Sequence, residues 1–208
     1  DSGHIQEKEI EWVNRKRMRA GKQPNDPIYT QQDAEDCLKL FVGLDYETKV
    51  TINENISFVL KDAGHMLGSA VIEAYLTEDG VEKKVVFTGD LGNDDQPIIN
   101  DPVKIDSADV LITESTYGDR LHSNITDQSN KFIQIILETI ERGGNVIIPS
   151  FAVGRTQEII YEINKYLTDD TVRERLEKVH VYVDSPLAVN ATKIFETQHK
   201  FYDEEALR

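Results

Sequence analysis

Four short runs in which apolar and polar residues alternate follow one another between residues 49 and 90. They read KVTI, ISFVL, AVIEAYL and KKVVFTGD, and begin at residues 49, 56, 70 and 83. Because side chains alternate between the two faces of a strand, a period of two predicts strands that are buried on one side. The segment TEDGVEKK between the last two runs predicts a tight hairpin, since Asp-Gly is favoured in two-residue turns. These runs constrain the first part of the chain to a hairpin-rich sheet, and ADVLITES (108–115) predicts one further strand.

Helical patterns surround this sheet and then alternate with apolar segments. Residues 1–20 predict a helix with Ser2 as its N-cap, and Thr30 caps a second predicted helix that ends near Gly43. After residue 120 the chain predicts three main helices, at 126–144, at 154–167 and from about 187, with strands at 145–150 and 180–185 between them. Strands that alternate with helices indicate parallel α/β packing. We therefore expect an α/β fold with a domain boundary near residue 120, which gives domains 1–120 and 121–208.

The formal net charge of −15 does not favour nucleic-acid binding, because binding to phosphates requires Lys and Arg. One segment, RKRMRAGK (15–22), is an exception and carries five cations. The simplest interpretation of this segment is the solvated end of a helix, where cations interact favourably with the helix dipole.

Neither a membrane protein nor a disulfide-stabilised one is indicated. No apolar run approaches the ~20 residues needed to span a bilayer, and no leader peptide is recognisable. The single cysteine, Cys37, excludes an internal disulfide, and we expect it to be a core residue of the second helix. A reducing, cytoplasmic setting is consistent with this composition.

Polar residues follow four of the predicted strands at the point where each ends. His65, Asp90, Glu114 and Asp184 occupy these positions, and His65 stands between glycines in AGHMLGS. A sheet holds such residues rigidly, so ligand and catalytic groups gather where strands end. Each residue alone is more typical of a turn, a loop or a helix cap than of a functional role. Their joint order favours a site, at which His65 and Asp90 would converge at one edge of the sheet.

Five segments together resemble a known family. DAGHMLGSA, FTGDLGN, ESTYGDR, PSFAVGRTQE and DSPLA occur in the order found in the β-CASP branch of the metallo-β-lactamase fold, whose members are mostly zinc-dependent RNA-processing nucleases. The resemblance covers essentially the whole chain. It implies the later part of an αββα sandwich, followed by the start of a βαβ-type β-CASP domain, with single-stranded RNA as substrate.

The resemblance also implies roles for individual residues. His65 matches a histidine that binds one zinc, and Asp90 matches an aspartate that bridges two zinc ions. Glu114 matches an acidic residue that orients a catalytic histidine beside the metal centre. Arg155 and Ser185 lie where contact with a substrate phosphate is conceivable. His4 and His122 match no ligand, and we expect them to form cap and loop hydrogen bonds.

Two zinc ions in such a site would activate water and neutralise charge on the phosphorus centre. A catalytic zinc needs at least three protein ligands, and this chain offers only His65 and Asp90. The family's upstream His-x-His-x-Asp-His motif and its two downstream histidines do not occur here. We therefore expect this chain to be a piece of a larger enzyme and to be inactive alone.

Two other functions remain open. One is a hydrolase of the same fold that acts on a small ester or thioester, although such enzymes lack the β-CASP insertion. The other is a catalytically inactive scaffold subunit of an RNA-processing complex. The sequence leaves open the choice between internal and terminal cleavage and the oligomeric state.

Overall fold

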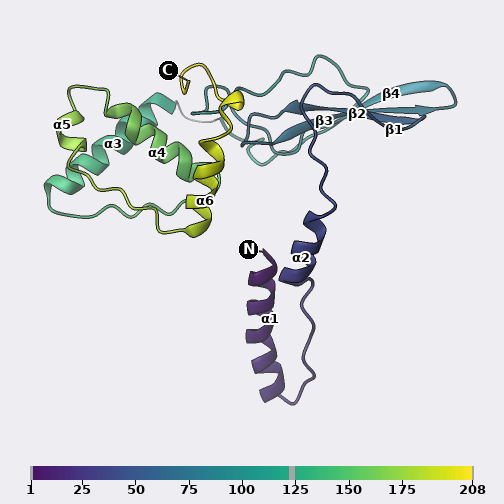
Figure 1. Ribbon diagram of the computed structural model, residues 1–208, viewed down its shortest axis with the longest axis horizontal. Coiled ribbons are helices and arrows are strands. Elements are labelled where there is room, and N and C mark those ends of the chain that lie inside the picture. Colours follow the sequence, from purple (N-terminus) through teal and green to yellow (C-terminus); the bar gives the residue numbers. More distant parts are fainter. Residues whose placement is uncertain (1, 122–124, 208) are drawn as a thin grey trace. The chain divides into compact units, whose positions relative to one another are not determined.

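The structure is a computed structural model that describes residues 2–121 and 125–207, with the side chains of 125–127 left aside (Figure 1). His122 therefore lies outside the described residues. The chain divides into two compact units, one up to Leu44 and one from Asp45 onward. The predicted boundary near residue 120 falls inside the second unit, and it stays a prediction.

The first unit is a pair of helices, α1 (Ser2–Arg19) and α2 (Gln31–Leu38). Thr30 caps α2 as predicted: its hydroxyl accepts from the backbone N–H of Asp33 at 3.1 Å, and its own N–H donates to the Asp33 carboxylate at 2.8 Å. The helix ends at Leu38 rather than near Gly43, and Cys37 is exposed. The prediction that Cys37 is a core residue is wrong, because α2 has only eight residues and buries none of them.

The second unit begins with a five-stranded sheet in the order β1-β2-β3-β4-β5, whose strands are β1 (Val50–Asn53), β2 (Ile56–Asp62), β3 (Ala70–Glu78), β4 (Val81–Phe87) and β5 (Val110–Ile112). The first four strands are antiparallel neighbours, whereas β5 pairs parallel to β4. The β3–β4 turn is the predicted Asp79-Gly80, with φ of 50° and 77°. Both angles are positive, as the right-handed twist of a hairpin requires.

The two faces of the sheet differ in burial. On one face, Val71 and Val86 are fully buried and pack with Ala63 and Ile105. On the other face, Ile72, Phe87 and Ile112 form one row across β3, β4 and β5, and they remain 38–51% exposed. An apolar row of this kind fits one sheet of a sandwich, because a second layer would remove it from water.

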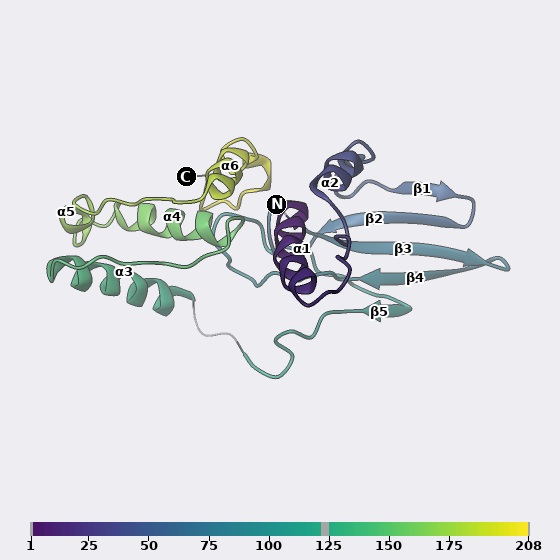
Figure 2. The same cartoon turned by 90° about the horizontal axis from the view of Figure 1, so that it is seen from below.

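Helices dominate the rest of the second unit (Figure 2). They are α3 (Ile125–Glu141), α4 (Arg155–Tyr166), α5 (Arg173–Leu176) and α6 (Pro186–Phe195), followed by the short 3₁₀ helix η1 (His199–Phe201). Ile133, Ile136, Leu137 and Leu176 form the buried centre of a cluster that joins α3 to α5. The side-chain amide of Gln157 joins α4 to α6, since its nitrogen donates to Ala188 O at 3.3 Å and to Thr192 Oγ1 at 3.0 Å.

Two predicted strands are not formed in the described part of the chain. Residues 145–150 and 180–185 are non-helical but pair with no other strand, and Ile147 and Tyr182 are 89% and 85% exposed. A strand needs a neighbour for its backbone N–H and C=O groups, and the described residues supply none here. No helix in the described ranges is long and apolar enough to cross a membrane.

Candidate metal and active site

The sheet topology brings three of the predicted site residues to one edge. Strands β2 and β4 are both antiparallel to β3, and β5 is parallel to β4, so β2, β4 and β5 run in the same direction. Their carboxyl ends therefore meet at one edge. His65, Asp90 and Glu114 follow these three ends, as the polar residues at the strand ends predicted.

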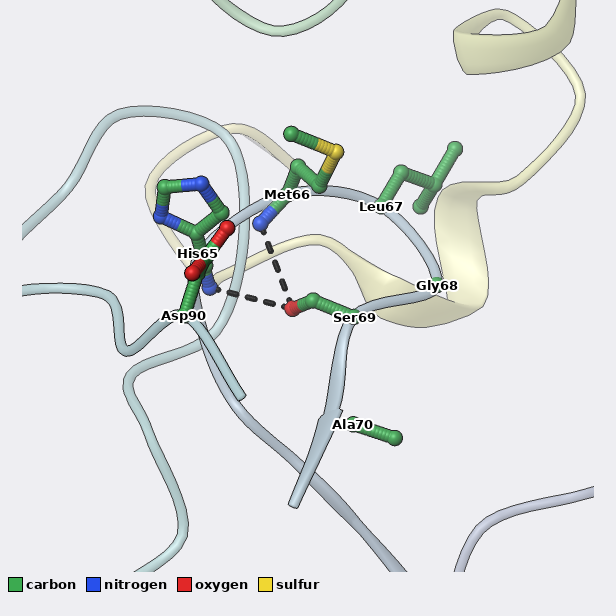
Figure 3. A pocket seen from close by; sticks show the side chains of 7 residues that line it. All are labelled: His65, Met66, Leu67, Gly68, Ser69, Ala70 and Asp90. Carbon is green, nitrogen blue, oxygen red and sulfur yellow. Dashed lines mark hydrogen bonds between the residues drawn. The ribbon is translucent and has the colours of Figure 1, made fainter. Parts of the chain in front are cut away.

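The loop that carries His65 connects Asp62 of β2 to Ala70 of β3, which face each other in the ladder. Ser69 closes this loop, because its hydroxyl accepts from the backbone N–H of His65 at 3.2 Å and of Met66 at 3.3 Å (Figure 3). Gly64 has φ of 59°, and a side chain there would come within 2.5 Å of the Pro102 nitrogen. The glycine before His65 is thus required by the backbone, and the imidazole itself is not part of the turn.

The loop that carries Asp90 packs directly on the His65 loop. The backbone N–H of Gly92 donates to the Ala63 carbonyl at 2.9 Å. A Cβ at Gly92 would lie 1.6 Å from the Gly64 carbonyl oxygen. The two loops approach each other backbone to backbone, and this fixes the distance between the segments that bear His65 and Asp90.

Glu114 is joined by hydrogen bonds to the loop that carries Asp90 and to the residue that follows β4. Its Oε1 accepts from the Leu91 N–H at 2.7 Å, and its own N–H donates to Thr88 Oγ1 at 3.3 Å. The Leu91 hydrogen bond is the main cause of a lowered pKa for Glu114, and hydrogen bonds from Thr116 act in the same direction, as does the nearby His65 imidazole. Glu114 is therefore held ionised beside the Asp90 loop, within electrostatic reach of His65.

His65 and Asp90 line one pocket of about 290 Å³, which is open to solvent (Figure 3). The other lining residues all belong to the His65 loop and the first residue of β3: Met66, Leu67, Gly68, Ser69 and Ala70. Asp90 is exposed and His65 is half-buried, so both side chains are accessible from the pocket.

Arg155 and Ser185 lie at the first turns of α4 and α6. Arg155 pairs with Glu158 at 2.7 Å, and the Ser185 hydroxyl accepts from the Ala188 N–H at 3.2 Å as the N-cap of α6. Burial raises the pKa of Glu158, while the positive charge of Arg155 and the nearby His65 imidazole lower it. Both predicted phosphate-binding residues therefore already have a structural partner, and their contact with substrate stays a prediction.

His65 and Asp90 are of the right chemical type to bind zinc, but two ligands are too few for a catalytic zinc site. An imidazole and a carboxylate that share one pocket are suitable zinc ligands, yet a catalytic zinc uses three protein ligands or more. In residues 2–121 and 125–207, no group of three or more His, Cys, Asp or Glu side chains is placed to hold a metal ion. His65 and Asp90 can therefore supply one side of a metal site and need further donors.

Two residues that support the site were missed from the sequence. Ser69 stands four residues after His65, where a hydroxyl can cap a tight loop, and this spacing could have indicated it. Tyr46 donates its hydroxyl to the Ser69 carbonyl at 2.6 Å. It precedes the sheet by several residues, and no local pattern indicates a contact over 23 positions.

Replacing Tyr46 with Phe is expected to lower the free energy of unfolding by about 1 kcal/mol, the usual net value of such a hydrogen bond. Burial and the negative charge of Asp62 raise the pKa of Tyr46 from 10.0 to about 12. Because the folded pKa exceeds that of the unfolded chain, the stabilisation is complete below pH 10 and is lost as the pH rises through 12. Denaturant unfolding at several pH values measures it, with Tyr182→Phe as an exposed control. Equal stability of Tyr46→Phe and the unaltered protein at neutral pH would contradict the assigned role.

Comparison with known proteins places these observations in a family. The β-CASP domain pattern matches residues 156–208. A ribonuclease of Thermus thermophilus is 32% identical over 181 residues, which cover 87% of this chain and 39% of that protein. An RNase J-like protein of Methanocaldococcus jannaschii is 39% identical over 170 residues, covering 80% of this chain and 38% of that protein. Cleavage and polyadenylation specificity factor 73 of Drosophila melanogaster is 28% identical over 171 residues, which cover 82% of this chain and 24% of that protein.

The five-stranded sheet with its flanking helices fits the metallo-β-lactamase type of α/β fold. The chain belongs to the β-CASP family. It spans about two fifths of the length of the Thermus and Methanocaldococcus relatives.

Proposed function

We propose that the full-length protein containing this chain is a zinc-dependent ribonuclease that hydrolyses phosphodiester bonds of single-stranded RNA. The observation that carries this proposal is the convergence of His65 and Asp90 on one open pocket, with Glu114 hydrogen-bonded to the Asp90 loop. The names of the relatives, which include a ribonuclease and an RNase J-like protein, support RNA as the substrate.

His65 and Asp90 would hold the metal centre. Further donors would come from segments of a longer protein, since two protein ligands are too few. When bound, a zinc pair activates water and stabilises negative charge on the phosphoryl group. The pocket is open, so a strand of RNA can reach both side chains.

Glu114 would act on another side chain rather than on the substrate. Its carboxylate accepts a hydrogen bond from the Leu91 N–H, which holds it in place and lowers its pKa. A fixed carboxylate of this kind can accept a hydrogen bond from a histidine and orient its ring. That histidine would protonate the leaving oxygen as the phosphodiester bond breaks.

The alternatives have less support. Hydrolysis of a small ester or thioester does not account for relatives named as ribonucleases that match 80% or more of the chain. An inactive scaffold subunit would be expected to lose His65, Asp90 or Glu114, and all three are present. The cytoplasmic location expected from the sequence remains part of this proposal.

The test uses the full-length protein and an end-labelled single-stranded RNA. We expect cleavage that a chelator abolishes and added zinc restores. His65→Ala is expected to lower both the zinc content and the cleavage rate, by about a hundredfold or more in rate, because a metal ligand contributes several kcal/mol. His180→Ala, at an exposed histidine away from the pocket, is the matched control. Cleavage that persists without metal, or with unchanged zinc content in His65→Ala, would reject the proposed site.

A further inference from the structure

One side of α1 is held firmly within the first unit. Gly3 is buried, and a Cβ there would lie 2.7 Å from the Cα of Gln31. The amide of Asn14 exchanges two hydrogen bonds of 2.8 Å with the backbone of Asn25. Arg17 Nε donates to the Gln23 carbonyl at 2.8 Å. Together these contacts fix the rotation of α1 about its own axis.

The opposite side of α1 presents cations around an aromatic ring. At about 100° per residue, six exposed positions fall within an arc of roughly 100°, and one of them is Ile5, which is 52% exposed. We call the other five the basic–aromatic face: Lys8, Trp12, Arg15, Lys16 and Arg19. Trp12 lies near the centre of this face and is 58% exposed. Lys16 Nζ lies 3.6 Å from the centroid of its ring.

The local charge at this face is opposite to that of the chain. Residues 12–25 contain five Lys or Arg residues and no Asp or Glu, within a chain of net charge −15. Glu11 lies 3.8 Å from Lys8 and 3.7 Å from Arg15, and Glu9 lines the same pocket as Lys8 and Trp12. Such exposed ion pairs are weak, so Glu11 does not neutralise the face.

We propose that the basic–aromatic face binds single-stranded RNA, with its cations on phosphates and Trp12 stacked on a base. The proposal rests on the proposed function, which supplies RNA as the partner. A cationic track with an exposed aromatic ring is the combination that binds single strands without sequence preference. The helix dipole accounts for cations in the last turn, but it does not account for an exposed tryptophan among them. An acidic protein surface would pair with the cations and leave the indole ring with no contact beyond Lys16.

The experiment measures binding of a fluorescein-labelled oligouridylate by fluorescence anisotropy over a range of salt concentrations. It uses the full-length protein carrying Asp90→Asn, so that the probe is not cut. Arg15→Gln/Arg19→Gln is expected to raise Kd about tenfold and to reduce the slope of log K against log salt by about 1.4, since each phosphate contact contributes ~0.7. Trp12→Ala is expected to raise Kd severalfold with an unchanged slope, because stacking releases no counterions.

The control removes two cations elsewhere, at exposed positions on the second unit, as Arg142→Gln/Lys178→Gln. It has the same net charge as the test variant and is expected to keep wild-type affinity. Equal Kd values for the test and control variants would overturn the proposal. A test variant that keeps its affinity for the RNA probe but loses association with another protein would also overturn it. If the probe binds through this face but the full-length protein with Asp90 intact cleaves no RNA, the proposed ribonuclease is contradicted and this inference stands.

Discussion

Asp90→Asn in the full-length protein is expected to reduce RNA cleavage by about a thousandfold or more. The substitution keeps the shape of the side chain and removes the negative charge that would hold two zinc ions. About 4 kcal/mol of transition-state stabilisation lost corresponds to a thousandfold in rate. Asp90 is exposed and follows β4 in a loop, so the substitution should leave the free energy of unfolding within about 0.5 kcal/mol of wild type.

Single-turnover cleavage and zinc content per chain measure this effect. Asp94→Asn is the matched control, because Asp94 is an exposed aspartate only four residues further along the same loop. The control should keep both cleavage and zinc. Undiminished cleavage in Asp90→Asn would remove Asp90 from the metal centre.

Gly92→Ala is expected to disrupt the site although it replaces neither of the proposed metal ligands. A methyl group at this position would lie 1.6 Å from the Gly64 carbonyl oxygen and 2.1 Å from its carbon, so the two loops must separate. Their separation would break the hydrogen bond from Gly92 N–H to the Ala63 carbonyl. We expect a loss of about 3 kcal/mol or more in the free energy of unfolding, since overpacking against backbone cannot relax through a rotamer change.

Thermal or denaturant unfolding measures the stability, and zinc content reports on the site. Gly43→Ala is the control, because it has open space around it and no positive φ. A variant Gly92→Ala as stable as Gly43→Ala, with full zinc content, would show that the loops do not need their close approach.

Local patterns in the sequence predicted the sheet and the edge at which the site forms. The alternation around Val71 and Val86 predicted strands β3 and β4, and Asp79-Gly80 predicted their turn. The positions of His65 and Asp90 on either side of a hairpin predicted their shared edge. These predictions succeeded because each depends on a few neighbouring residues and on the geometry of a sheet.

Predictions that required a distant partner did less well. Residues 145–150 have the apolar composition of a strand, but no neighbour pairs with them in the described structure. Cys37 has the helical spacing of a core residue, and the helix ends one residue later without a layer to cover it. The contact of Tyr46 with Ser69 and the close approach of Gly92 to Gly64 depend on loop conformations that composition does not specify.

Leu67 links the ordering of the His65 loop to residues that are synthesised much later. It packs with Ile98, Ile99 and Phe195, in a cluster that also includes Tyr161 and Tyr202. A ribosome makes residues 63–69 long before Phe195, and contacts distant in sequence form late. The strands on either side of the loop can pair early. We therefore expect the segment bearing His65 to remain incompletely ordered in the nascent chain until the helix that ends at Phe195 has been synthesised.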